Sequence, residues 1–144
     1  MRQSILRYFI SLLLVSLCIC SATSIFIISG SMKEDSEREM MYSVKLIEYN
    51  LDYSGDLNKQ IETLNPLAFS DDTRISVIDE KGKVLADTYK NDISSNHLKR
   101  EEVQQALHSS NHEGYAMRRS ETTNQPLLYA AYYKDTHIIR LSIP

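Results

Sequence analysis

An uncharged stretch from Tyr8 to Ile28 constrains this chain more than any other feature. About 20 consecutive apolar residues suffice to cross a hydrocarbon core of roughly 30 Å as one α-helix. Such a helix also satisfies its own backbone N–H and C=O groups, which lipid cannot do. The sequence therefore predicts a tip at residues 1–7, a membrane helix at residues 8–29 and an exported domain at residues 30–144.

The charges that flank this stretch predict its orientation. Arg2, Arg7 and the α-amino group precede it without any acid, whereas Lys33, Glu34 and Asp35 follow it. Lys and Arg close to a span favour the cytoplasm, and acids contribute little. We expect a cell-membrane protein with a cytoplasmic N-terminus, a lipid-embedded helix and an extracytoplasmic domain. The alternative is a cleaved secretion signal, although the apolar stretch is longer than the 7–15 residues usual for one.

Composition limits what the exported domain can be. Residues 30–144 are about the size of one domain. A net charge of −3 gives no indication of nucleic acid as a partner. Both cysteines, Cys18 and Cys20, lie in the predicted span, so no disulfide can stabilise the exported part. Its stability must come from its own core, from pairing with another copy, or from both.

An apolar stripe continues beyond the predicted span. Met40, Val44, Ile47 and Leu51 recur at spacings of four, three and four residues, which predicts that the helix runs on to about Tyr53. In one interpretation this stripe packs on a sheet of the same domain. In the other, part of it pairs with the same helix of a second copy, which gives a homodimer. The two interpretations are compatible.

The rest of the chain predicts an α+β fold. Alternation of buried and exposed positions predicts strands, and 3.6-residue periodicity predicts short helices. The expected helices are at residues 56–64 and 100–107, and the expected strands are at residues 73–78, 83–87, 114–119, 126–133 and 137–143. Tight connections favour a five-stranded antiparallel sheet with the long N-terminal helix packed on it. We expect the helices to gather on one face of this sheet.

Three local patterns in the second half of the chain carry a family resemblance. The first is the hairpin at residues 73–87, with its Ile-Asp-x-x-Gly-x-Val-Leu-x-Asp spacing, and the second is the segment at residues 96–107. The third is Leu-Tyr-Ala-Ala at residues 128–131 followed by Ile-Arg-Leu-Ser at residues 139–142. With these patterns the chain resembles the extracytoplasmic PAS-like (single-Cache) sensor region of membrane histidine kinases of the phosphate-regulon type.

The resemblance implies a signal-input role in a two-component system. The parent kinase would transfer phosphate from ATP to a histidine in domains outside residues 1–144. His97, His108, His112 and His137 all lie in the exported part, where ATP is absent, so none is expected to accept phosphate. We expect no catalytic residue and no cofactor in this chain. The alternatives are the input domain of a chemoreceptor or a cyclic-dinucleotide enzyme, or a single-span binding or regulatory protein.

Five residues are candidates for ligand binding. His97 and Arg100 lie beside Asn96, where they either form a polar lid or satisfy backbone amides at a loop-to-helix junction. Tyr115, Arg119 and Tyr129 lie on adjacent predicted strands, together with Arg118, Tyr132 and Tyr133. These side chains either line a pocket for a small anion or organic acid, or cover the core and point to water. A protein ligand is the other possible partner outside the cell.

Two further clusters have weaker support. His108 and His112 are four residues apart, but Ser109-Ser110-Asn111 between them reads as a loop, so we expect no metal site. The acidic residues Asp71, Asp72, Asp79 and Glu80 either sense cations or serve turns.

Overall fold

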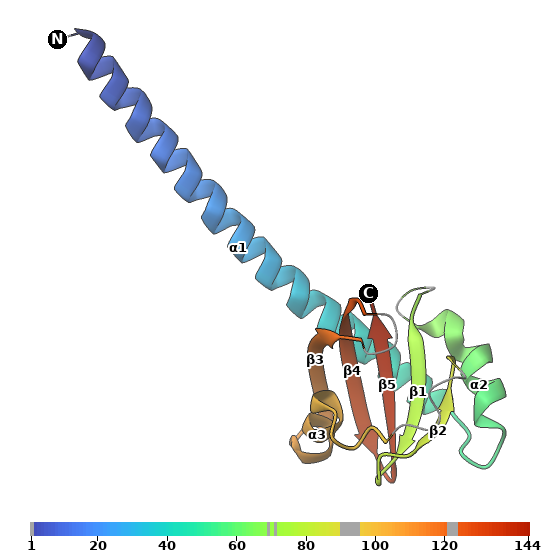
Figure 1. The fold of residues 1–144 in the computed structure, drawn as a ribbon. Helices are drawn as coiled ribbons and strands as arrows, with labels where there is room; N and C mark the ends of the chain where they lie inside the picture. The colour runs from blue at the N-terminus through green and yellow to red at the C-terminus, as the bar shows by residue number, and fades with distance from the viewer. Residues whose placement is uncertain (1, 69, 71, 90–95, 121–123) are drawn as a thin grey trace. The chain divides into compact units, whose positions relative to one another are not determined.

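The computed structural model describes residues 2–68, 70, 72–89, 96–120 and 124–144. One helix, α1, extends from Arg2 to Asn50 (Figure 1). The chain divides into two compact units, Met1–Ser36 and Glu37–Pro144, and α1 contributes to both. The first unit consists of the N-terminal part of α1.

This N-terminal part of α1 is long and apolar enough to cross a membrane. Its most apolar 18-residue window has a mean hydropathy of 2.4, and none of that window is buried within the protein. The hydroxyl groups of Ser11, Ser16 and Thr23 donate to backbone carbonyls three or four residues earlier in the helix. These bonds satisfy polar groups that lipid could not solvate. The orientation of this helix remains a prediction.

The second unit contains a five-stranded antiparallel sheet, which confirms the α+β fold. The strands lie in the order β2-β1-β5-β4-β3, and all neighbours are antiparallel. The strands are β1 (Arg74–Asp79), β2 (Val84–Asp87), β3 (Glu113–Arg119), β4 (Pro126–Lys134) and β5 (His137–Ile143). The shorter helices are α2 (Leu57–Leu64), the 3₁₀ helix η1 (Asn65–Leu67) and α3 (Glu101–His108).

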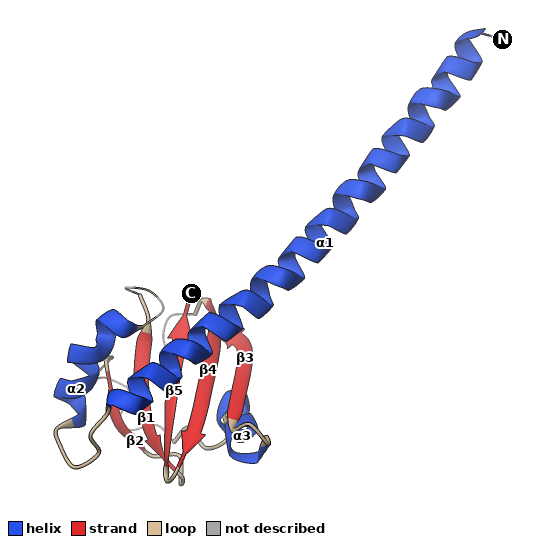
Figure 2. Cartoon of the chain, turned by 180° about the vertical axis from the view of Figure 1, so that it is seen from behind, coloured by secondary structure: helices blue, strands red, loops and turns tan. Residues whose placement is uncertain are grey.

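One face of the sheet is covered by the last turns of α1 (Figure 2). The stripe side chains Met40, Val44 and Ile47 are fully buried. They share a core with alternate residues of the central strands, including Val77 of β1 and Leu141 of β5. Burying such side chains contributes about 1.5–3 kcal/mol each. The stripe therefore packs on the domain's own sheet, as the first interpretation predicted.

The expectation that all helices gather on one face is wrong. Val103 and Ala106 of α3 pack with Ile78 and Ile138, which point to the face opposite the α1 core because strand side chains alternate. Figures 1 and 2 show α3 behind the sheet when α1 is in front of it. Gly114 of β3 permits this packing, since a Cβ there would overlap the carbonyl oxygen of Glu102.

Element ends differ from expectation by a few residues. Helix α1 ends at Asn50, three residues before the expected end. Gln60 holds Asp52, two residues beyond the end of α1, by accepting from its N–H and donating to its carbonyl. These bonds replace helical ones, so the chain turns before Gly55. Asp56 caps α2 as predicted, because its carboxylate accepts from the N–H of Lys59.

The close contact between β3 and α3 predicts the effect of one added methyl group. We expect Gly114→Ala to lower the free energy of unfolding of the domain by about 1–3 kcal/mol, as overpacking does. Urea unfolding of the full chain in detergent micelles measures this change. Gly30→Ala is the matched control, because nothing lies within 4 Å of an added Cβ there. Equal stability of both variants would contradict the tight packing of α3.

A second prediction concerns Tyr53, whose ring stacks on His137 at 4.0 Å between ring centroids. Burial, and then the charges of Glu48 and Asp135, raise the pKa of Tyr53 to about 12. In the unfolded chain the Tyr53 hydroxyl ionises near pH 10. The stabilisation that comes from keeping this hydroxyl protonated in the fold is therefore present below pH 10 and is lost between pH 10 and about 12. We expect Tyr53→Phe to reduce the loss of thermal stability over this pH range. Equal losses of thermal stability in both proteins between pH 10 and about 12 would contradict the raised pKa of Tyr53.

Candidate functional site

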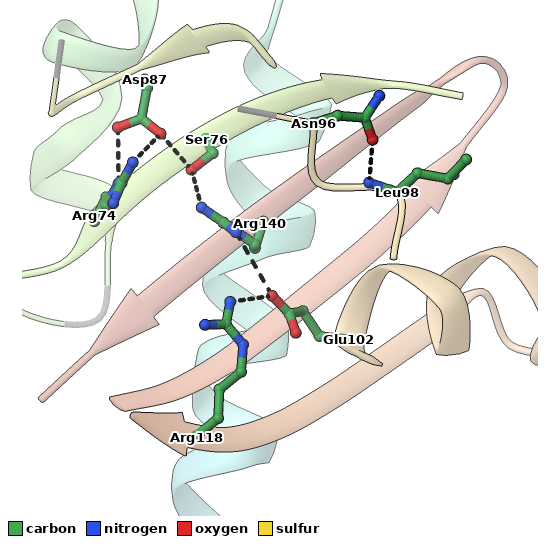
Figure 3. A network of polar contacts seen from close by, with 8 residues as sticks. All are labelled: Arg74, Ser76, Asp87, Asn96, Leu98, Glu102, Arg118 and Arg140. Carbon is green, nitrogen blue, oxygen red and sulfur yellow. Dashed lines mark hydrogen bonds and ion pairs between the residues drawn. The ribbon is translucent and has the colours of Figure 1, made fainter. Parts of the chain in front are cut away.

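The face of the sheet that α1 leaves open contains a chain of charged side chains. Strand register places Arg74 opposite Ser142, and Ser76 opposite Arg140. Arg74, Ser76 and Arg140, together with three charged residues from β2, β3 and α3, form what we call the arginine network (Figure 3). Its members are Arg74, Ser76, Asp87, Glu102, Arg118 and Arg140.

One end of the network is a forked ion pair. Arg74 donates from Nε to Oδ1 of Asp87 and from Nη2 to Oδ2, each at 2.9 Å. The carboxylate of Asp87 is fully buried. It also accepts from the hydroxyl of Ser76 at 2.8 Å and from the N–H of Tyr89 at 2.7 Å. Such charge-assisted, two-point contacts fix the plane of the guanidinium group.

Arg140 is the centre of the network. Only 2% of this residue is exposed, and its Nη2 donates to the Ser76 hydroxyl at 3.0 Å. Its Nη1 lies 3.6 Å from Oε1 of Glu102. Burial lowers the pKa of Arg140 to about 10, and the charge of Glu102 opposes this shift. Arg140 is therefore charged at neutral pH.

The other end of the network connects the sheet to α3. Oε1 of the fully buried Glu102 accepts from Nη2 of Arg118 at 3.1 Å. The Arg118 guanidinium carbon lies 3.9 Å from the ring centroid of Tyr129, and that of Arg140 lies 5.6 Å from the same ring. Both distances are typical of cation–π contacts. Tyr129 therefore supports two of the three arginines.

The network has more positive than negative groups. Three guanidinium groups face two carboxylates. Within the part of the chain that the structure describes, Oε2 of Glu102 and Nε of both Arg118 and Arg140 are buried without a hydrogen-bond partner. Unpaired polar atoms at such depth are costly. An interior of this kind favours an anion over a cation, and the described residues contain no cluster of His, Cys, Asp or Glu able to hold a metal.

The same face opens into a pocket of about 260 Å³ where the strands begin and end. We call it the strand-end pocket. Arg74 and Ser142, which are paired in the sheet, form part of its wall. The complete lining among the described residues is Asp72, Arg74, Tyr89, Ser120, Gln125, Leu127, Ser142 and Pro144. Its volume is suited to a small molecule, since drug-sized ligands occupy about 300–1,000 Å³.

His97 and Arg100, two of the predicted ligand-binding residues, lie in the loop that precedes α3. His97 is 1% exposed, and its N–H donates to the carbonyl of Gly82 at 2.7 Å. Arg100 is the N-terminal cap residue of α3. Asn96 accepts from the N–H of Leu98 and donates to the carbonyl of Lys81. This geometry has the features of a structural junction beside the hairpin turn.

The structure separates the three candidate residues on the strands. Tyr115 packs against the α1 core, and its hydroxyl donates to Oε2 of Glu113 at 3.0 Å; burial is the main reason that its pKa is raised. Arg119 is exposed and donates to the carbonyl of Asn124. Tyr129 alone lies beside the arginine network.

The weaker clusters are also dispersed. His108 lies at the end of α3, with Nδ1 2.8 Å from the carbonyl oxygen of Gln104, whereas His112 packs edge-on against Tyr133. Asp79 accepts from the N–H groups of Lys81 and Lys83 and so serves the hairpin turn. Asp72 borders the strand-end pocket, and Asp71 lies outside the described residues.

Sequence reasoning missed five members of the network: Arg74, Ser76, Asp87, Glu102 and Arg140. The signal that could have identified them is position. Arg140 lies on a strand whose other residues are almost all buried, and Glu102 points inward with Val103 and Ala106 of α3. A charge at such a position requires a partner.

Comparison with known proteins shows the fold. No family model and no curated protein matches the chain. The ligand-binding domain of the Campylobacter jejuni chemoreceptor Tlp3, bound to 4-methylisoleucine, matches 80% of this chain with a TM-score of 0.57 and 15% identity. A methyl-accepting chemotaxis protein from Vibrio parahaemolyticus matches 81% with a TM-score of 0.50 and 20% identity.

A third solved structure is the Bacillus subtilis YkuI protein, which has an EAL domain and is bound to its substrate c-di-GMP and to calcium. It matches 77% of this chain with a TM-score of 0.56 and 18% identity. The chain spans 31% of YkuI, 52% of the Tlp3 domain and 90% of the Vibrio protein. At these identities the likeness establishes a shared architecture of helix and antiparallel sheet.

The arginine network predicts a large effect from the loss of one charge. We expect Glu102→Gln to lower the free energy of unfolding by about 3–5 kcal/mol, because the buried Arg140 and the partly buried Arg118 lose their counter-charge. Chemical denaturation of the full chain measures the change. Glu101→Gln is the matched control, since that side chain is exposed on the same helical turn. A Glu102 variant as stable as the control would show that the network contributes nothing to folding.

Proposed function

We propose that this chain is the signal-input region of a membrane sensor, with a PAS-like domain outside the cell. The observation that carries this proposal is the continuity of α1. A single helix includes the segment able to cross a membrane and the stripe buried in the domain core. A change in domain packing would therefore act on a helix that continues into the bilayer.

The proposed output is a histidine kinase of a two-component system. The hairpin, the segment at residues 96–107 and the closing strands support this class through the resemblance already described. The solved neighbours favour the same general role, since two are named as a chemoreceptor ligand-binding domain and a methyl-accepting chemotaxis protein. The third contains an EAL domain, so input to a chemoreceptor or a cyclic-dinucleotide enzyme is the second candidate. The sequence encoded downstream of residue 144 distinguishes them.

We also propose that two copies pair through α1 outside the membrane. Tyr42 and Tyr49 are 72% and 81% exposed, and they are seven residues apart on the side that faces away from the sheet. Leu46 lies between them and is partly exposed. Large side chains at seven-residue spacing are typical of paired helices. Anchoring both copies in one membrane would align these faces.

One crosslinking experiment in intact cells tests both placement and pairing. In a background with Cys18 and Cys20 replaced by Ser, we expect Tyr42→Cys and Tyr49→Cys each to give a dimer with a membrane-impermeant bis-maleimide. Thr63→Cys is the matched control, because Thr63 is exposed on α2 and should remain monomeric. Dimers that form only after permeabilisation would contradict the orientation. Equal crosslinking at residues 42, 49 and 63 would contradict the pairing.

A further inference from the structure

We propose that the strand-end pocket binds a small organic carboxylate, with the guanidinium group of Arg74 as its counter-charge. This inference rests on the proposed sensor function, because it names the class of ligand that the input domain would take. The sequence did not single out any of the lining residues except Asp72, which it grouped with acidic residues that could sense cations.

The pocket is built from one face of the sheet. Arg74, Leu127 and Ser142 belong to three adjacent strands and point to the same side, since Arg74 pairs with Ser142 and strand side chains alternate. Ser120 follows β3 two residues after Arg118 and extends the same row. Pro144 follows Ser142 with the same two-residue spacing. The pocket is therefore the outer end of the face that contains the arginine network.

Arg74 places a guanidinium group in the pocket wall, at the point where the strand-end pocket meets the arginine network. Arg74 lines the pocket, whereas Asp87, its ion-pair partner, is fully buried and is not among the described lining residues. The forked contact with Asp87 fixes the orientation of the guanidinium group, so a ligand meets a preorganised cation. The network as a whole has one guanidinium group more than it has carboxylates. Asp72 is an exposed acid at the rim and weakens this preference.

The remaining lining selects an organic anion over an inorganic one. Ser120, Ser142 and Gln125 offer hydroxyl and amide donors that suit carboxylate oxygens. Tyr89, Leu127 and Pro144 offer apolar surface that suits a short hydrocarbon body. Inorganic phosphate would place charged oxygens against this apolar surface, and removing those oxygens from water without a polar partner is unfavourable. A carboxylate with a few carbons satisfies both kinds of wall.

A chain of polar contacts connects Arg74 with α3, so ligand binding at Arg74 would affect the contacts of that helix. Asp87 connects Arg74 to Ser76, Ser76 accepts from Arg140, and Arg140 lies beside Glu102 of α3. A carboxylate that also binds the Arg74 guanidinium group would share its charge with Asp87 and so weaken the first of these contacts. The pocket and α3 therefore share one continuous set of hydrogen bonds and ion pairs.

Calorimetric titration of the full chain in lipid nanodiscs tests the site. The probes are butyrate, its neutral analogue butyramide and inorganic phosphate. We expect butyrate to bind with a Kd of about 1 mM or tighter, and expect no measurable binding of the other two. If butyramide bound with the same affinity as butyrate, the proposed role of the ligand's charge would be wrong. If phosphate bound and butyrate did not, the assignment of an organic ligand would be wrong. If none of the three probes bound, the proposed ligand site would be wrong.

Two variants and a control locate the binding. Arg74→Gln should abolish butyrate binding, although it also leaves Asp87 buried without its counter-charge. Asp72→Asn changes only an exposed rim charge, and it should tighten binding about two- to fivefold, the range of a surface charge interaction. Arg119→Gln, on the exposed end of β3, should leave the Kd unchanged. Equal affinity of the Asp72 and Arg119 variants would place butyrate elsewhere.

This titration is independent of the crosslinking experiment. Successful crosslinking with no butyrate binding would remove the ligand assignment and leave the membrane sensor intact. Butyrate binding that follows the predicted variants, without paired helices in cells, would remove the helix pairing and leave the ligand assignment intact.

Discussion

The packing of α1 on the sheet is the contact on which the rest of this structure depends. Cys18 and Cys20 both lie in the segment able to cross a membrane, so the domain has no disulfide to replace lost packing. Met40, Val44 and Ile47 cover one face of the central strands. Removing them would expose the core, and a small domain has little stability to spare. The last turns of α1 are thus a necessary part of the folded domain.

The two faces of the sheet are covered by different kinds of side chain. The α1 face is apolar, whereas the α3 face combines a small apolar cluster with a buried charged network. Replacing a buried ion pair with apolar side chains is often neutral or stabilising. Arg140 and Glu102 are therefore a costly way to fill this space. A charged network beside a pocket is better explained by a requirement for polarity at that face than by stability.

The sequence allowed most of the fold to be predicted, and the site much less. The stripe from Met40 to Leu51 and the alternation along β5 depend on periodicity alone, so they were visible in the chain. The face that α3 occupies depends on Gly114, whose importance appears only when two backbones meet. Arg74 and Asp87 are 13 residues apart in sequence, and only the register of the hairpin brings them together. Sequence reasoning favoured tyrosines because they cluster in sequence, although Tyr115 and Tyr129 point to opposite faces.

The central strands are the physical route between the two faces. Arg74 and Ser76 flank Ile75, and Ser76 and Ile78 flank Val77, so β1 alternates between the network and the α1 core. Arg140 has the same relation to Ile139 and Leu141 on β5. A displacement of Arg140 therefore reaches side chains that contact α1 through a single peptide unit. Allosteric coupling energies of about 1–3 kcal/mol are typical, which is comparable to the strength of a hydrogen bond to a charged group. The loss of one contact of the network would therefore change the free energy of the domain by an amount similar to a typical coupling energy.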